Sequence, residues 1–223
     1  MTDRGKPPRP CVLPADPFLY PIIDASMIGG HSLREWVTWL AGPGKAPLVQ
    51  WRFKGLTDNA ALAGARELRA ATRDLGVILI INDRPDIARI VEADGVHLGQ
   101  EDLDPEDARA LMPGALIGVS THSRAQFETA LTRPVDYIAV GPVFETASKA
   151  NPDPVVGLEF VTWARQQTTK PIVAIGGITG ANAAALAQAG ARGLAVISEL
   201  MKAARPQEAA AAFVAAIRSE RAA

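Results

Sequence analysis

The chain has 223 residues, 48% hydrophobic and 21% charged, which is long and apolar enough for the core of one large α/β domain. A formal charge of -1, with no basic block, argues against a surface built to hold nucleic acid or an anionic membrane. One cysteine, Cys11, excludes an intramolecular disulfide and a cysteine metal cluster; this is usual in a reducing compartment, so we expect a cytoplasmic protein.

The first 16 residues are rich in proline and charge and lack the apolar core of a signal peptide. We interpret residues 1–16 as a poorly ordered lead-in to a single domain over residues 17–218. No later apolar run approaches membrane-spanning length, so no membrane partner is expected.

Short apolar runs rich in β-forming residues alternate with segments of helical periodicity. The candidate strands are 18–23, 47–51, 77–81, 95–98, 115–119, 136–140, 171–175 and 193–197. The candidate helices lie near 32–41, 58–74, 84–92, 104–111, 123–131, 157–166, 180–188 and 206–218, several with Ser, Thr, Asp or Asn caps. Strands that are each followed by a helix predict a parallel sheet, and at this length a closed TIM (β/α)₈ barrel is the economical arrangement. A doubly wound open sheet is the competing one.

Polar and glycine residues follow most of the predicted strands where each strand ends. They are Gln50 to Lys54, Asn82-Asp83, Gln100 to Asp102, Ser120 to His122, Gly141-Pro142, Gly176-Gly177 and Ser198. The carboxyl ends of the strands of a closed barrel meet at one rim, which is where such barrels carry their catalytic groups. The pattern therefore favours the barrel and predicts one shared site at that rim.

Gly176, Gly177 and Ser198 stand at two strand-to-helix junctions, after the seventh and eighth predicted strands. Loops at these positions commonly bind phosphate in this fold, because free backbone N–H groups point at the anion. The alternative is that the two glycines only form a tight turn.

Gln50, Arg52 and Lys54 project to one side of the second strand, and the aromatic residues between them project to the other. Arginine and lysine at a rim suit a polyanion such as pyrophosphate. The alternative is that Arg52 and Lys54 are structural ion partners of Asp83 and Asp102.

Asp83 and Asp102 end neighbouring strands beside these cations. The pair predicts an Mg²⁺ site, since Mg²⁺ takes one or two protein carboxylates together with water and substrate phosphate oxygens. For either acid alone the alternative is a helix N-cap, with Asp83 before the helix near 84–92 and Asp102 or Asp104 before the next helix.

Thr146, Ser148 and Lys149 lie in the longest polar connection, where they are candidates for closing over an anion; a plain solvated loop is the alternative. His31 is interpreted as incidental. His97, in mid-strand, is either an inward-facing structural histidine or an acting one, and His122 at the rim is a candidate acid or base. No carboxylate is clearly placed to orient His122, so no nucleophilic triad is predicted.

From about residue 18 to residue 215 the chain resembles the thiamine phosphate synthase (thiamine-phosphate pyrophosphorylase) family. The resemblance is carried in order by VQWRFK, LIINDRPDIA, ADGVHLGQEDL, IGVSTHS, DYIAVGPVFETASK, VVGLEF, PIVAIGGIT and GLAVIS. It implies a TIM barrel that joins 4-amino-5-hydroxymethyl-2-methylpyrimidine diphosphate to 4-methyl-5-(2-hydroxyethyl)thiazole phosphate. The products are thiamine phosphate and pyrophosphate, Mg²⁺ is required, and the reaction is dissociative, with no protein nucleophile.

Carried over by position, the resemblance implies that Gln50, Arg52 and Lys54 bind the pyrimidine diphosphate, with Asn82 and Lys149 as further diphosphate contacts. It implies Asp83 and Asp102 as Mg²⁺ ligands and Ser120 near the pyrimidine and its leaving oxygen. Thr146, Ser148, Gly177, Ile197 and Ser198 match the thiazole phosphate site. Ser120, Arg52 and Lys149 are the expected catalytic residues.

A sister family, the thiazole tautomerases, shares the fold and the thiazole phosphate site, with His122 as its possible proton carrier. Its members tend to lose the acids that hold metal and diphosphate, whereas Asn82, Asp83 and Gln100 to Asp102 are intact here, which favours the synthase. A third reading is a catalytically silent barrel that binds thiamine intermediates, but a retained set of buried charges is costly without a ligand. The oligomeric state is left open.

Overall fold

The protein forms a closed barrel of eight parallel strands, described here from a computed structural model that covers residues 12–42, 44–146 and 153–218. The strands are β1 (Phe18–Asp24), β2 (Leu48–Arg52), β3 (Ile78–Asn82), β4 (Gly95–Leu98), β5 (Leu116–Thr121), β6 (Tyr137–Val140), β7 (Ile172–Ile175) and β8 (Gly193–Val196). Each strand pairs with the next, and β8 closes on β1. The predicted TIM barrel is confirmed, and the open sheet is wrong.

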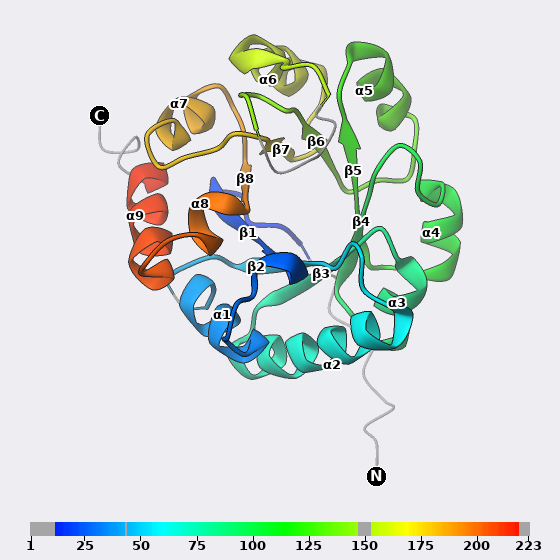
Figure 1. The fold of residues 1–223 in the computed structure, drawn as a ribbon. Coiled ribbons are helices and arrows are strands. Elements are labelled where there is room, and N and C mark those ends of the chain that lie inside the picture. Colours follow the sequence, from blue (N-terminus) through cyan, green and yellow to red (C-terminus); the bar gives the residue numbers. More distant parts are fainter. Residues whose placement is uncertain (1–11, 43, 147–152, 219–223) are drawn as a thin grey trace.

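Helices surround the barrel on its outside (Figure 1). They are α1 (Leu33–Leu40), α2 (Asp58–Leu75), α3 (Pro85–Ile90), α4 (Pro105–Leu111), α5 (Arg124–Leu131), α6 (Gly157–Gln167), α7 (Ala183–Gln188) and α9 (Pro206–Arg218). Two short helices at the ends of strands were not among the candidate helices: a 3-10 turn at Ala25–Met27 after β1, and α8 (Ser198–Met201) after β8, where the sequence indicated only a strand-to-helix junction at Ser198.

Local side-chain bonds set several helix starts. Ser32 and Glu35 form a reciprocal capping box at the start of α1, and Ser123 caps α5. Helix α7 begins later than the predicted residue 180, because the Asn182 side chain bonds the Thr179 N–H and the Gly177 carbonyl and shapes a turn ahead of the helix.

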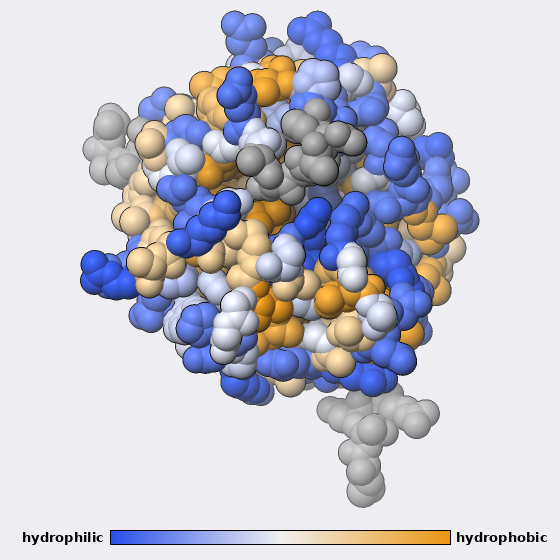
Figure 2. Space-filling view, in the orientation of Figure 1, coloured by the Kyte–Doolittle hydropathy of each residue, from blue (hydrophilic) through white to orange (hydrophobic). Residues whose placement is uncertain are grey.

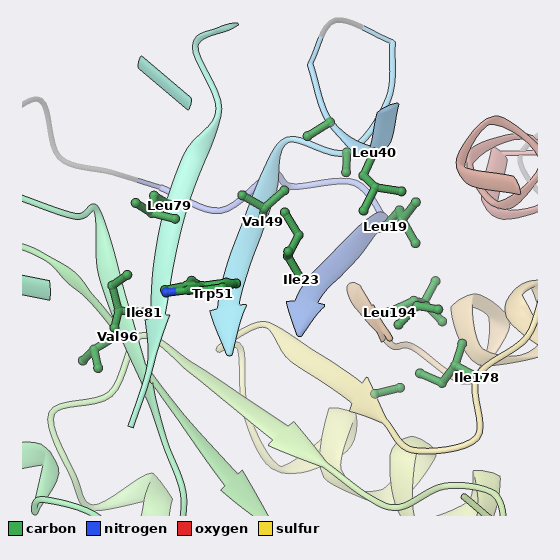
Figure 3. Packing of buried hydrophobic residues seen from close by; sticks show 14 of the residues in the cluster. Leu19, Ile23, Leu40, Val49, Trp51, Leu79, Ile81, Val96, Ile178 and Leu194 are labelled. Carbon is green, nitrogen blue, oxygen red and sulfur yellow. The ribbon is translucent and has the colours of Figure 1, made fainter. Parts of the chain in front are cut away.

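Alternation along the strands divides the core into two layers. Outward residues such as Leu19, Val49 and Trp51 pack against the helices (Figure 3). Inward residues such as Tyr20 and Leu48 fill the barrel itself. Hydrophilic residues cover much of the face shown in Figure 2, with hydrophobic residues in smaller patches among them. None of the helices within the described ranges combines the length and apolarity needed to cross a membrane.

Leu13 belongs to the inner layer, although it precedes the first strand. It is 6% exposed and packs in the cluster of Phe18, Leu48 and Leu116, which lie at or near the starts of their strands. The chain therefore enters the barrel at the end formed by the amino termini of the strands, which we call the floor.

Two aspartates tie strands together at the floor. One Asp94 carboxylate oxygen accepts hydrogen bonds from the Leu79 N–H at 2.8 Å and from Arg69 at 2.7 Å. Asp136 repeats the arrangement with the Ile117 N–H at 2.7 Å and Arg109 at 2.5 Å. Each carboxylate satisfies a strand amide and a helix arginine at once.

Replacing Asp94 should destabilise the fold far more than replacing an exposed ion-pair partner. Asp94→Ala leaves the Leu79 N–H and the Arg69 guanidinium without their acceptor, so we expect a loss of about 2–3 kcal/mol in the free energy of unfolding. The control is Asp74→Ala, whose bond to Arg34 joins side chains 60% and 54% exposed and should cost less than about 1 kcal/mol. Urea unfolding measures both, and equal losses would contradict the assigned role of Asp94.

Candidate active site

A cavity of about 350 Å³ opens at the carboxyl ends of the strands and gathers most of the predicted site residues. Gln50, Arg52, Asn82 and Ser120 reach it from β2, β3 and β5. Thr146, Gly177, Ile197 and Ser198 reach it from the later connections. Residues more than a hundred positions apart in the chain thus share one space. Ser148 and Lys149 lie outside the described residues.

The inner wall of the cavity rests on a continuous run of buried hydrogen bonds. Gln50 Nε2 donates to the Tyr20 hydroxyl at 2.8 Å, and the Tyr20 and Tyr137 hydroxyls are 2.9 Å apart. The Tyr137 hydroxyl lies 3.0 Å from His97 Nδ1, and His97 Nε2 lies 2.8 Å from Ser120 Oγ. His97 is therefore inward-facing and hydrogen-bonded, as one of the two sequence interpretations had it.

Arg52 is held in place by a carboxylate that the sequence did not indicate. Its guanidinium pairs with Asp24, which is 4% exposed and also accepts from the Ser26 N–H at 2.9 Å and the Ser26 hydroxyl at 2.6 Å. Burial alone would raise the pKa of the Asp24 carboxyl, but the bonds from Ser26 and the charge of Arg52 outweigh it and hold the pKa below its usual value. The alternative that Arg52 pairs with Asp83 or Asp102 is wrong, because Arg52 pairs with Asp24.

Lys54, Asp83 and Asp102 form a second cluster. Lys54 Nζ lies 3.4 Å from Asp83 Oδ2, so this structural ion pair of the alternative interpretation is present. Burial, together with the hydrogen bond and the negative charge of Asp102, raises the pKa of the Asp83 carboxyl to about 6, and Lys54 offsets only part of the rise. Two partly buried acids are thus in contact, and Lys54 neutralises only part of their negative charge.

Neither acid serves as a helix cap. Arg84 stands at the start of α3, and Asp104 caps α4 by accepting from the Glu106 N–H at 2.9 Å. Asp83 has a φ of +64°, a left-handed conformation that aspartate and asparagine tolerate better than most residues. Asp102 accepts from the Gly99 N–H at 2.6 Å within its own loop.

The cluster lies beside the cavity and does not line it. Asn82, immediately before Asp83, does line the cavity. Within the described ranges, no group of three or more His, Cys, Asp and Glu side chains is arranged to hold a metal ion. Asp83 and Asp102 are the pair that fits one: the pKa of Asp83 is raised in part by the negative charge of Asp102, and Mg²⁺ needs only one or two protein carboxylates.

The glycines after β7 have a structural reason to be glycine. Gly176 and Gly177 have φ values of +86° and +65°, and a Cβ on Gly177 would stand 2.5 Å from the Glu145 carbonyl oxygen. The two glycines therefore form a tight turn, and both also line the cavity, so the turn and a place at the site occur together. Lys202, which the sequence did not single out, adds a cation to the lining.

His122 has a carboxylate neighbour after all. Its Nδ1 lies 2.5 Å from the Gly141 carbonyl, so Nδ1 carries a proton, and its Nε2 lies 3.5 Å from Asp153 Oδ2. The expectation that no carboxylate orients His122 is corrected by this contact. His31 packs edge-on against Trp36 and Trp39 and takes no part in the cavity lining.

Comparison with known proteins now gives the family. The family model described as thiamine monophosphate synthase matches residues 19–200. The chain belongs to the thiamine monophosphate synthase family. Thiamine-phosphate synthase of Koribacter versatilis (strain Ellin345) is 42% identical over 207 residues, which cover 91% of this chain and 97% of that protein. The protein of the same name from Chloroflexus aurantiacus is 43% identical over 185 residues, covering 83% and 85% of the two chains.

Solved structures of this and other families share the barrel. Thiamine phosphate pyrophosphorylase from Pyrococcus furiosus superposes with a TM-score of 0.81 at 31% identity, covering 91% of this chain and 96% of that one. Orotidine 5'-phosphate decarboxylase from Pyrococcus horikoshii has a TM-score of 0.63 at 17% identity, covering 90% and 99%, and shares the fold alone. The barrel is thus shared with other families, and the matches of sequence over most of the chain show the thiamine monophosphate synthase family.

Removing the charge of Asp83 should stabilise the protein at neutral pH when divalent cations are chelated. Its folded pKa of about 6 exceeds the ordinary 3.8, so its contribution to stability is present below pH 3.8 and is lost as pH rises through 6. Asp83→Asn, which suits the left-handed backbone, should gain about 1–2 kcal/mol at pH 7.5 after allowance for partial exposure, and no gain near pH 3.5.

The measurement is urea unfolding in EDTA from pH 3.5 to 7.5. Asp102→Asn is the matched variant, since it removes the repulsion and should move the titration of Asp83 toward its ordinary range. A pH profile of Asp83→Asn that parallels the unaltered protein would refute the raised pKa.

Proposed function

We propose that this chain is a thiamine-phosphate synthase. It would transfer the pyrimidinylmethyl group of 4-amino-5-hydroxymethyl-2-methylpyrimidine diphosphate to the nitrogen of 4-methyl-5-(2-hydroxyethyl)thiazole phosphate. The observation that carries the proposal is the meeting, in one cavity, of residues that match the family's diphosphate site with residues that match its thiazole phosphate site. A cytoplasmic location stays a prediction from the sequence.

The pyrimidine diphosphate would lie over β2, β3 and β5. Arg52 offers the diphosphate a planar set of donors, and its pair with Asp24 fixes the direction of that set before substrate arrives. Asn82 and Ser120 add neutral donors from the next strands. Lys54 and, from the connection after β6, Lys149 would supply further positive charge.

Asp83 and Asp102 would hold Mg²⁺ at the edge of the cavity. When bound, Mg²⁺ supplies positive charge that stabilises the diphosphate as a leaving group. The support within the chain is the carboxylate pair itself, which is partly buried, mutually repulsive and not used in helix capping.

In the proposed reaction the bond between the pyrimidine methylene carbon and the diphosphate oxygen breaks, and the electron pair leaves with the oxygen. The thiazole nitrogen then donates its lone pair to the methylene carbon, which gives a thiazolium and free pyrophosphate. Charge and atoms balance without a protein nucleophile or a proton transfer. The chain's own residues have to hold the leaving oxygen and keep water from a short-lived cation.

The thiazole tautomerase remains the second candidate, because His122 and Asp153 both line the cavity, with His122 Nε2 3.5 Å from Asp153 Oδ2. That pair is suited to moving a proton. The synthase is favoured by Asn82, Asp83 and Asp102, because members of the tautomerase family tend to lose the acids that hold metal and diphosphate. Asp83 and Asp102 also repel each other across a partly buried contact, which a bound cation would relieve.

The direct experiment supplies both substrates and follows thiamine phosphate and pyrophosphate with and without Mg²⁺. We expect both products in equal amounts with Mg²⁺ and almost none in EDTA. Asp83→Asn and Asp102→Asn should each lower Mg²⁺-dependent kcat/KM by about 10²-fold or more while thiazole phosphate still binds. Isomerisation of a thiazole phosphate without pyrophosphate release would favour the tautomerase, and binding without turnover would favour a silent barrel.

Arg52→Lys tests the planar contact with the diphosphate. Lysine keeps the charge but loses the fork, so we expect kcat/KM to fall by about 10²-fold. Lys54→Arg is the matched exchange in the other direction at a side chain 63% exposed, and it should change kcat/KM less than about fivefold. Steady-state kinetics at saturating Mg²⁺ distinguishes the two, and equal effects would argue against a specific role for the Arg52 guanidinium.

A further inference from the structure

Five side chains from five strands form one run of hydrogen bonds through the barrel, which we call the polar chain: Gln50, Tyr20, Tyr137, His97 and Ser120. Gln50 and Ser120, at its two ends, line the cavity, as does His97, whereas Tyr20 and Tyr137 are 1% and 0% exposed and do not. The run thus joins two site residues through the interior of the protein.

The polar chain has a direction because its first member is a donor. The Gln50 Nε2 amide nitrogen can donate but not accept, so the Tyr20 oxygen is the acceptor in this bond. The single Tyr20 hydroxyl proton is then donated to the Tyr137 oxygen 2.9 Å away. The Tyr137 proton then goes to His97 Nδ1 at 3.0 Å. Burial raises the pKa of both tyrosine hydroxyls above the ordinary value, so each keeps the one proton that this order requires.

A histidine whose Nδ1 accepts carries its proton on Nε2 when neutral. His97 Nε2 therefore donates to Ser120 Oγ at 2.8 Å, which leaves the Ser120 proton for an acceptor elsewhere. The cavity that Ser120 lines is where a substrate oxygen would stand.

We propose that the polar chain holds His97 as the Nε2–H tautomer and thereby makes Ser120 a hydrogen-bond donor to an oxygen of the bound diphosphate ester. Tyr20, Tyr137 and His97 are positioning residues that act through Ser120. Their part in turnover rests on the proposed function, whereas the tautomer of His97 does not.

The backbone makes room for this arrangement. A Cβ on Gly118 would overlap the Tyr137 ring, so only glycine at that point of β5 lets the hydroxyl reach both Tyr20 and His97. The Tyr137 ring also stacks on the His97 ring, with centroids 5.6 Å apart and planes 20° apart, which fixes the imidazole orientation.

The first test is ¹⁵N NMR of the histidine rings in the substrate-free protein, with His97→Asn used to assign the signals. We expect an unprotonated Nδ1 and a protonated Nε2 for His97. A protonated Nδ1 beside an unprotonated Nε2 would mean that the run points the other way, with Ser120 donating to His97, and would overturn the proposal. This measurement needs no substrate, so it tests the tautomer of His97 even if the protein is inactive in the synthase assay.

The second test breaks the polar chain away from the cavity. Tyr137→Phe removes the donor to His97 Nδ1, and we expect mixed tautomers, a kcat lower by about 10-fold or more, and KM values within about twofold. The control is Thr121→Val on the same strand, which removes a buried bond to the Ala139 carbonyl at 2.9 Å outside the polar chain and should keep kcat.

Urea unfolding shows whether the two variants lose comparable stability, so that a general loss of fold is not mistaken for a loss of positioning. Tyr20→Phe interrupts the polar chain one step earlier and replaces Tyr137→Phe if that variant fails to fold. A shifted His97 tautomer with unchanged kcat in either tyrosine variant would overturn the positioning role. An equal fall of kcat in Thr121→Val would overturn it too.

Discussion

Alternation along a closed parallel barrel is the constraint on which the site depends. Every second side chain of a strand points inward, where water does not reach and polar groups need partners from other strands. Strand β2 shows the consequence over a few residues: Leu48 packs in the core, Gln50 is hydrogen-bonded in the interior, and Arg52 is paired at the rim. Core and site are thus successive layers of one packing pattern.

The two charged clusters at the rim are in opposite electrostatic conditions. Asp24 and Arg52 neutralise each other's charge, and Ser26 donates a hydrogen bond to the same carboxylate. The guanidinium is therefore already oriented before an anion binds. Asp83 and Asp102 repel each other across a partly buried contact. Lys54 offsets only part of this repulsion, so the first cluster is neutralised while the second keeps excess negative charge, which is the condition that a bound cation would relieve.

The sequence sufficed for the barrel because its signals are local and repeated: apolar runs of strand length, caps at helix starts and polar residues after strands. The resemblance to a family also named eight of the residues that line the cavity, among them Gln50, Arg52 and Ser120. Pairings between distant segments had no such signal. Asp24 is 28 positions from Arg52, Tyr20 is 117 from Tyr137, and Asp153 meets His122 from the connection that follows the neighbouring strand β6. Ser148 and Lys149 fall outside the described residues, so their roles stay predictions.

Leu13 has a consequence for how this barrel can be built into larger assemblies. Because that side chain seals the floor, the polypeptide meets the domain at the end opposite the cavity mouth. A purification tag, a surface tether or a partner fused directly at Val12 would therefore join the domain at the end away from substrate entry. A deletion that includes Leu13, by contrast, would remove a buried side chain from the apolar interior and expose that interior at the amino-terminal end of the barrel.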